Sequence, residues 1–148
     1  MIPHKIIYNN REGANEMFEM KEEYKIGIKE IDEQHERLFQ IAEKAYTLLT
    51  NEFIVDKYDG IVEILDELTE YAKLHFTYEE EYMQEIGHKM MFSQKIDHHD
   101  FIVMLEDINL DEIDDNQEDA IMNILTYLGD WLVKHILEKD MLIGKDLN

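Results

Sequence analysis

Apolar residues recur along most of the chain in alternating steps of three and four, which is the spacing that places side chains on one face of an α-helix. This pattern predicts four helices, over about residues 31–50, 57–86, 91–109 and 117–140. Asp56, and Asp115 or Asn116, are the expected N-caps of the second and fourth helices, and Gly87 is the expected left-handed residue after the second. Four amphipathic helices with short connections predict an all-α fold, an antiparallel up-down-up-down four-helix bundle.

The chain before the first helix lacks this period. Residues 1–19 contain Asn9, Asn10 and Gly13, so we expect an irregular N-terminal arm there, followed by an ordered lead-in loop over residues 20–29. The predicted division is therefore an extension, residues 1–19, and a bundle domain, residues 20–148.

Composition narrows the classes of function. The chain has 35 acidic and 14 basic residues and a formal net charge of −21, which argues against nucleic acid or an anionic membrane surface as a partner. No apolar run approaches the roughly 20 residues of a membrane span, and the first residues lack the pattern of a signal peptide, so we expect a cytoplasmic protein. The chain has no cysteine, so any metal must be held by nitrogen and oxygen ligands.

Each of the four predicted apolar faces contains one histidine: His35, His75, His98 and His135. A single histidine at such a position is more often a hydrogen-bonded core residue than a metal ligand. Four imidazoles in one core would repel one another if protonated and would lose hydration if neutral. A divalent metal removes both costs, because neutral imidazole is a common metal ligand, so the four histidines together predict a metal site.

Two carboxylates indicate how many metal ions the core would hold. Glu79 lies one turn after His75 on the same helix face. Asp140 follows His135 by five residues, which is roughly 140° around a straight α-helix. It can therefore share that face only if a π-bulge or a frayed turn intervenes. Four imidazoles and two carboxylates suit two ions better than one, and such ligands suit iron, manganese or zinc.

Several motifs follow one another along the chain: Ile28, the run Ile31-Asp32-Glu33-Gln34-His35, His75-Phe76 with Glu79-Glu80 and Met83, His98 with Phe101, and Trp131 with His135 and Asp140. In this order they resemble the hemerythrin family, and its bacterial members most closely. The resemblance covers about residues 18–142. It implies two iron ions with an oxo or hydroxo bridge, and O2 held as a peroxide on the iron that has fewer protein ligands, without net chemistry.

The resemblance also implies a role for each site residue. One iron would be held by His35 and His75 and the other by His98 and His135, with Glu79 and Asp140 bridging the two. The five-residue spacing before Asp140 is the family's own.

The chain departs from the family at Gln94, where the family normally has a histidine four residues before the one that matches His98. The side-chain oxygen of Gln94 would be a weaker, neutral ligand or would hydrogen-bond a bound water. Either role would open a coordination position, which favours redox chemistry on O2, peroxide or NO. Met20 stands where bacterial members commonly have a tryptophan, so we expect a different wall of the oxygen pocket.

The neighbours of the predicted ligands have simpler expected roles. The core or pocket walls are expected to include Phe76, Met83, Phe101, Trp131 and Met20. Glu80 is a candidate partner for the outer nitrogen of a ligating imidazole, whereas His88 and His99 are expected to face solvent.

The sequence therefore predicts a non-haem di-iron protein that binds O2 for storage, delivery, sensing or scavenging, rather than an enzyme. The alternative is a di-iron oxidase, peroxidase or NO-handling enzyme that uses the position opened at Gln94. A third reading is an acidic interaction module whose histidines bind zinc or nothing. No nucleophile, separate acid–base pair or phosphate loop accompanies the cluster, so hydrolase and kinase readings have no support. The sequence identifies no protein partner.

Overall fold

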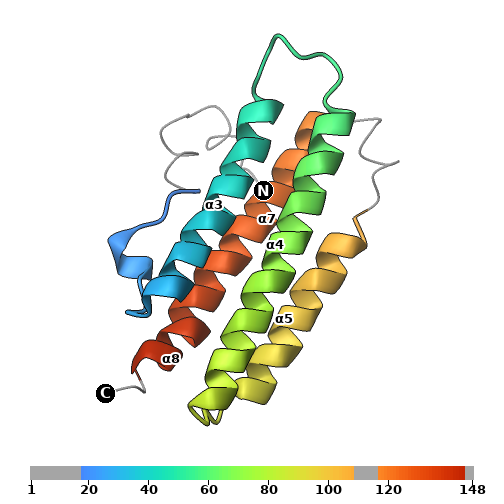
Figure 1. The fold of residues 1–148 in the computed structure, drawn as a ribbon. Coiled ribbons are helices and arrows are strands. Elements are labelled where there is room, and N and C mark those ends of the chain that lie inside the picture. Colours follow the sequence, from blue (N-terminus) through green and yellow to red (C-terminus); the bar gives the residue numbers. More distant parts are fainter. Residues whose placement is uncertain (1–17, 109–116, 146–148) are drawn as a thin grey trace.

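The computed structural model describes residues 18–108 and 117–145, and the regular elements in these ranges are helices (Figure 1). The long helices are α3 (Lys29–Leu49), α4 (Tyr58–Glu85), α5 (Met91–Glu106) and α7 (Gln117–His135). A short 3₁₀ turn, η1 (Glu22–Tyr24), precedes α3, and α7 continues into the π-helical turn η2 (Ile136–Asp140) and α8 (Met141–Lys145). The prediction of an all-α fold is confirmed. None of the helices in the described ranges is both long and apolar enough to cross a membrane.

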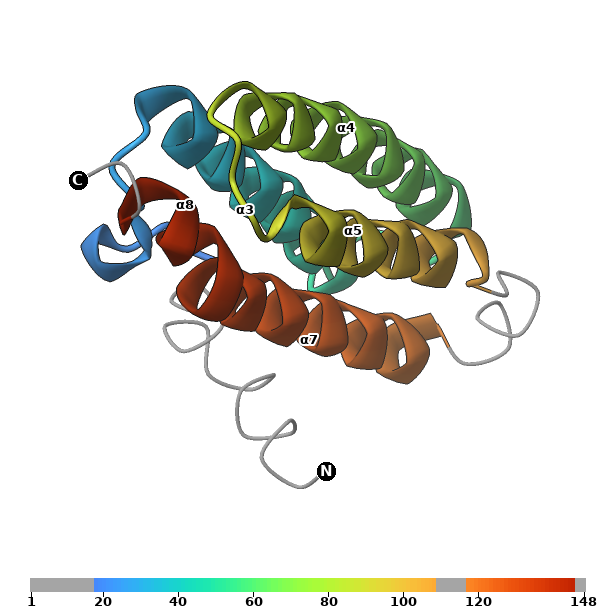
Figure 2. The same cartoon turned by 90° about the horizontal axis from the view of Figure 1, so that it is seen from below.

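The long helices form a four-helix bundle. In Figure 1 the colours run up α3, down α4, up α5 and down α7, which is the predicted up-down-up-down order. Helix α4 packs against α3 and α5, and α3 also packs against α7. Figure 2 shows the four helices side by side around one interior.

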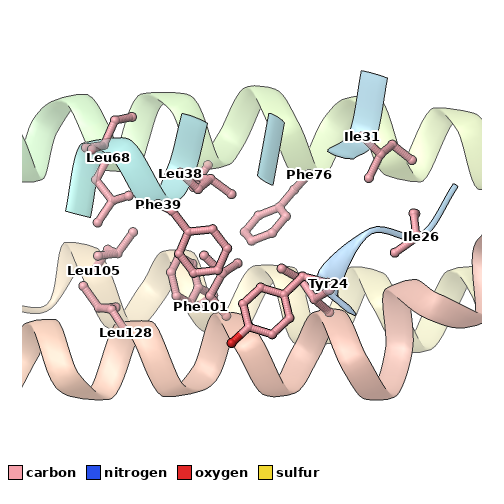
Figure 3. Packing of buried hydrophobic residues seen from close by; sticks show 14 of the residues in the cluster. Tyr24, Ile26, Ile31, Leu38, Phe39, Leu68, Phe76, Phe101, Leu105 and Leu128 are labelled. Carbon is pink, nitrogen blue, oxygen red and sulfur yellow. The ribbon is translucent and has the colours of Figure 1, made fainter. Parts of the chain in front are cut away.

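Apolar residues fill that interior in two clusters. The larger cluster includes Phe39 of α3, Phe76 of α4, Phe101 of α5 and Leu128 of α7, whose side chains meet between the helices (Figure 3). The smaller cluster contains Phe18 and residues from α3, α4 and α7. All the positions predicted for the buried face of the first helix are buried, namely Ile31, His35, Leu38, Ala42, Ala45 and Leu49.

The helix boundaries lie close to those predicted. Gly87 follows α4 with a φ of 65°, so the predicted left-handed residue is confirmed. The predicted N-cap Asp56 is wrong, because the N-cap of α4 is Lys57. Asp56, one residue before this N-cap, instead accepts a hydrogen bond from the N–H of Tyr58 through its Oδ1 at 3.0 Å. This bond ties the loop to the first turn of α4.

Three of the predictions fall on parts of the chain that are only partly described or not described. Asp115 and Asn116 lie outside the described residues, as does most of the N-terminal arm. The division into an extension and a bundle domain therefore stays a prediction. The expected lead-in loop is present, with η1 as its one helical turn.

The lead-in closes one end of the bundle through the first turn of α3 and through α8. Asp32 accepts the backbone N–H groups of Ile26 and Gly27 at 2.8 and 3.2 Å. Gly27 has a φ of 92°, which a glycine adopts without steric cost. Gly144 of α8 packs so tightly on this loop that a Cβ there would collide with the carbonyl oxygen of Ile26. These contacts hold the segment that directly follows Asp140.

Candidate metal centre

The predicted site residues come from all four long helices and meet inside the bundle. The histidines lie on α3, α4, α5 and α7, at exposed fractions between 0% and 6%. Glu79 of α4 and Asp140 at the end of η2 are both 0% exposed. Because each helix supplies part of the cluster, its geometry depends on the whole bundle rather than on one local motif.

Asp140 reaches the cluster because the helix widens before it. The residues from Ile136 to Asp140 form a π-helical turn, in which the N–H of Met141 bonds to the carbonyl of Ile136, five residues back. Asp140 Oδ1 then lies 3.3 Å from His135 Nε2. Of the two irregularities that the five-residue spacing allowed, a π-bulge or a frayed turn, the π-bulge is therefore the one present.

The two carboxylates lie between the two pairs of histidines. Glu79 Oε2 is 3.5 Å from His75 Nε2 and 3.7 Å from His35 Nε2, whereas Oε1 is 3.0 Å from His98 Nε2. Asp140 Oδ2 is 3.1 Å from His35 Nε2, and its Oδ1 is near His135. Each carboxylate thus directs one oxygen toward each half of the cluster.

The donor atoms fit two cations. Two overlapping groups, each with its potential ligand atoms within 4.8 Å of one another, are His35, His75, Glu79 and Asp140, and Glu79, His98, His135 and Asp140. Within the described residues, both ring nitrogens of His35, both oxygens of Glu79 and Oδ2 of Asp140 are buried without a well-aligned hydrogen bond, although Asp140 Oδ2 lies 3.1 Å from His35 Nε2 and Glu79 Oε1 lies 3.0 Å from His98 Nε2. Leaving such atoms unpaired is costly, and metal coordination would satisfy them.

The carboxylates and imidazoles also set one another's protonation. Burial acts to lower the pKa of His35 and of His98, but contacts with the neighbouring carboxylates outweigh it and raise each pKa to about 9. Burial lowers the pKa of His75 to about 4. Burial acts to raise the pKa values of Glu79 and Asp140, yet the adjacent histidines hold both below their usual range. At neutral pH the metal-free protein therefore holds His35 and His98 as imidazolium groups beside ionised Glu79 and Asp140.

The outer nitrogens of two histidines have hydrogen-bond acceptors that fix the rings. His75 Nδ1 donates to Gln34 Oε1 at 2.7 Å, and His98 Nδ1 donates to Glu80 Oε2 at 2.8 Å. Each acceptor takes a hydrogen bond from a protonated Nδ1, so Nε2 is the ring nitrogen that faces the cluster. It can coordinate a metal once it carries no proton of its own. The predicted role of Glu80 agrees with this contact.

The sequence analysis assigned no contact with a histidine to Gln34 or to Asp97. Asp97 Oδ2 lies 3.9 Å from His135 Nδ1 and 2.9 Å from Lys139 Nζ. The signal was present in the sequence, because each of these polar residues directly precedes a predicted ligand, Gln34 before His35 and Asp97 before His98. Each partners a histidine on a different helix, however, which only the packing reveals.

Gln94 lies in the cluster, one turn before His98 on α5, and is 1% exposed. Its Nε2 donates to Asp140 Oδ1 at 2.8 Å. A carboxylate oxygen can only accept a hydrogen bond, so the amide nitrogen must face Asp140. Gln94 Oε1 is then buried without a hydrogen-bond partner in the described part of the chain.

Aromatic rings cover the imidazoles of α5 and α7. Phe76 stacks on His98 with centroids 3.9 Å apart, and Trp131 stacks on His135 at 4.5 Å. Phe101 contacts both Phe76 and Trp131. These three predicted pocket residues therefore line one side of the cluster with apolar surface.

The remaining predicted neighbours lie farther out or differ from expectation. Met83 is 0% exposed in the core, and Met20 packs half-buried at its edge, so their role as pocket walls stays a prediction. His99 is exposed, as expected. The expectation that His88 faces solvent was wrong, because His88 is only 9% exposed. Its ring packs between the start of α5 and α8. Nδ1 accepts a hydrogen bond from the N–H of Met90 at 3.1 Å, and Nε2 lies 3.4 Å from the carbonyl oxygen of Leu142.

The fold and the cluster together define a class of protein, a helix bundle with a buried histidine–carboxylate centre suited to cations. The Hemerythrin HHE cation binding domain matches residues 26–146, and the chain therefore belongs to the hemerythrin family. The resemblance seen in the sequence motifs is confirmed.

Curated relatives carry the name bacteriohemerythrin. The chain is 48% identical over 124 residues to the bacteriohemerythrin of Clostridium acetobutylicum, across 84% of this chain and 96% of the relative. It is 29% identical over 120 residues to that of Stenotrophomonas maltophilia, across 81% and 74%. For that of Methylococcus capsulatus the identity is 26% over 117 residues, across 79% and 86%.

Proposed function

We propose that the chain holds two iron ions in this cluster and binds O2, for storage, delivery, sensing or scavenging. His35 and His75 would hold one ion and His98 and His135 the other, with Glu79 and Asp140 shared between them. Membership of the hemerythrin family and the bacteriohemerythrin relatives support this proposal. A cytoplasmic location remains a prediction from the sequence.

The observation that carries the proposal is the orientation of the two buried carboxylates. Glu79 has one oxygen beside His75 and the other beside His98. Asp140 divides its oxygens in the same way between His35 and His135. A single ion would need only one of these groups of donors, whereas two ions would use both oxygens of each carboxylate.

A pair of iron ions would supply reversible, redox-active binding of O2. The chain's own residues would control where and how that happens. Gln34 and Glu80 hold the rings of His75 and His98 in the orientation that directs Nε2 inward. Phe76 and Trp131 cover the other side of two imidazoles with apolar surface, which limits the access of water and protons.

A metal analysis joined to absorption spectra tests the proposal. We expect about two irons per chain, and a visible absorption band that appears when the reduced protein meets air and fades under nitrogen. Zinc, or no metal, in place of iron would contradict the proposal. Steady consumption of O2 without such a band would contradict a carrier and favour an enzyme.

A di-iron redox enzyme, an oxidase, peroxidase or NO-handling protein, is the second candidate, and Gln94 is the observation that favours it. Its neutral amide occupies the helix position one turn before His98, and its Oε1 has no hydrogen-bond partner within the described residues. An amide oxygen is a weaker ligand than an imidazole, so the second ion would be held less firmly there.

Replacement of Gln94 by histidine separates the two candidates. For an enzyme, Gln94→His should lower the turnover of peroxide or NO by about tenfold or more, because a firm ligand would occupy the open position. For a carrier, it should slow the spontaneous loss of the air-induced band. A variant that matches the parent protein in both measurements would show that Gln94 has no role at the metal.

A further inference from the structure

Helix α5 is apolar on two opposite faces. Its inner face carries Gln94, His98 and the buried core residues, whereas Phe92, Ile96 and Val103 are 74%, 62% and 38% exposed. Their spacings of four and seven residues place them in one stripe along the outer face. Figure 1 shows α5 at the edge of the bundle, with no other described helix on its outer side. Such a stripe on a highly charged protein indicates a contact surface.

Charges of both signs lie along this stripe, and they are separated by sign. Lys89 and Lys95 lie at or near its start, and Asp100 and Asp107 lie toward its end. All four are exposed, and within the described residues none has an ion-pair partner. Glu106, in contrast, pairs with Lys73 of α4 at 3.1 Å.

We infer that a second copy of this chain docks on the outer face of α5, with the two α5 helices antiparallel about a two-fold axis. The inference is independent of the metal and of O2 binding. A partner of one charge sign would meet like charge at one end of the stripe. An antiparallel copy brings the lysines of each chain to the aspartates of the other, and it covers the apolar stripe of both chains.

The net charge of the chain favours this face over others. Two chains that each carry a formal charge of −21 repel one another wherever acidic surfaces meet. Along the α5 stripe the two exposed lysines offset the two exposed aspartates, so two copies can approach there with little of that repulsion.

The size of the contact sets its expected strength. Helix α5 has 16 residues, and a helix of that length measures about 24 Å. A single helix pair buries an area at the low end of specific interfaces, so we expect a reversible dimer with a dissociation constant of about 1–100 μM.

Sedimentation velocity over a concentration series tests the inference. The metal-loaded chain should sediment as a monomer at about 1 μM and approach the dimer value at about 500 μM. Phe92→Glu should abolish this shift. Phe53→Glu is the matched control, because Phe53 is 97% exposed in the loop between α3 and α4, and it should leave the shift unchanged.

A charge-exchange experiment tests the antiparallel arrangement. One variant carries Lys89→Asp and Lys95→Asp, and the other carries Asp100→Lys and Asp107→Lys, and each alone should associate at least about tenfold more weakly. An equimolar mixture should regain the dimer, because complementary charges then meet at both ends. A monomeric parent chain at 500 μM, a dimeric Phe92→Glu variant, or a mixture that stays monomeric would each overturn the inference.

Discussion

At the scale of residues, Glu79 and Asp140 contact both halves of the cluster, whereas each histidine belongs mainly to one. Glu79 has oxygens within 3.7 Å of three different imidazoles. Loss of this carboxylate would remove a donor from each proposed ion and would leave buried imidazolium groups without their counter-charge. We therefore expect it to matter more than any one histidine.

Glu79→Ala should bind less than about one metal per chain, and in the presence of metal its free energy of unfolding should fall by about 3 kcal/mol or more, since metal binding stabilises only the folded state. Metal analysis and thermal unfolding measure the two effects. Glu81→Ala is the control, because Glu81 lies exposed on the same helix. Unchanged metal content in Glu79→Ala would refute the assignment of this residue.

The protonation of the cluster predicts a pH effect. The pKa values of His35 and His98 are raised to about 9, so both rings are charged at pH 7 in the metal-free protein. A metal can bind only after they lose a proton, so adding Zn²⁺ at pH 7 should release about two protons per chain. Titration in weak buffer measures this. Binding of Zn²⁺ at pH 7 without proton release would contradict it.

The same two histidines also predict how the metal-free fold responds to pH. In the folded protein the pKa values of His35 and His98 are about 9, above the value of 6.5 that a histidine has in the unfolded chain. Their contribution to stability is therefore complete below pH 6.5. It is lost as the pH rises through about 9. Metal-free protein should therefore lose more stability than metal-loaded protein over that interval.

At the scale of elements, the π-helical turn η2 explains a spacing that a regular helix cannot. The sequence alone showed that Asp140 lies on the wrong face of a straight helix for His135, and so required a bulge or fraying. It did not show which of the two occurs. The structure shows the bulge, and α8 follows it directly, with Gly144 against the carbonyl of Ile26.

Substitution of glycine tests this packing. Gly144→Ala should destabilise the protein by about 2–3 kcal/mol, because the new Cβ would collide with backbone that cannot rotate away. Gly60→Ala is the matched control: its Cβ would lie 2.6 Å from Leu48 Cδ2, the end of a flexible side chain, and alanine favours the helix. Chemical denaturation should show a clearly larger loss for Gly144→Ala. Equal effects would contradict the role given to α8.

Much of the bundle followed from the sequence, because its helices bury one regular face. The buried positions of α3 and the left-handed Gly87 were predicted from periodicity and capping rules. The N-cap of α4 was not, since Asp56 and Lys57 compete within one residue of each other. His88 looked exposed because it follows Gly87 in a turn, and its burial comes from contact with α8, more than 50 residues away in sequence.

The site followed from the sequence in part. Four histidines and two carboxylates on buried faces were enough to predict a shared centre. The acceptors of the outer nitrogens were harder to predict, because Gln34 of α3 serves His75 of α4 and Asp97 of α5 lies beside His135 of α7. Such pairs depend on the rotation of one helix against another, which periodicity does not fix.

At the scale of the whole molecule, the cluster links all four helices through one set of buried polar groups. Every long helix supplies an imidazole, and the polar atoms left unpaired in the described residues concentrate at this point. The folding of the bundle and the binding of metal should therefore be linked, with the metal-free protein less stable than the loaded one.

The most direct test of two ions in this cluster is an anaerobic titration of the metal-free protein with Fe²⁺, followed by the fluorescence of Trp131. Trp131 is the only tryptophan in the chain and stacks on His135 at 4.5 Å, so iron in that half of the cluster should quench it. We expect about two bound Fe²⁺ per chain at saturation by metal analysis, with Trp131 quenched, and the quenching to vanish in the His98→Ala, His135→Ala double variant. One bound Fe²⁺ per chain at saturation, or no quenching at all, would contradict a two-iron centre between these helices.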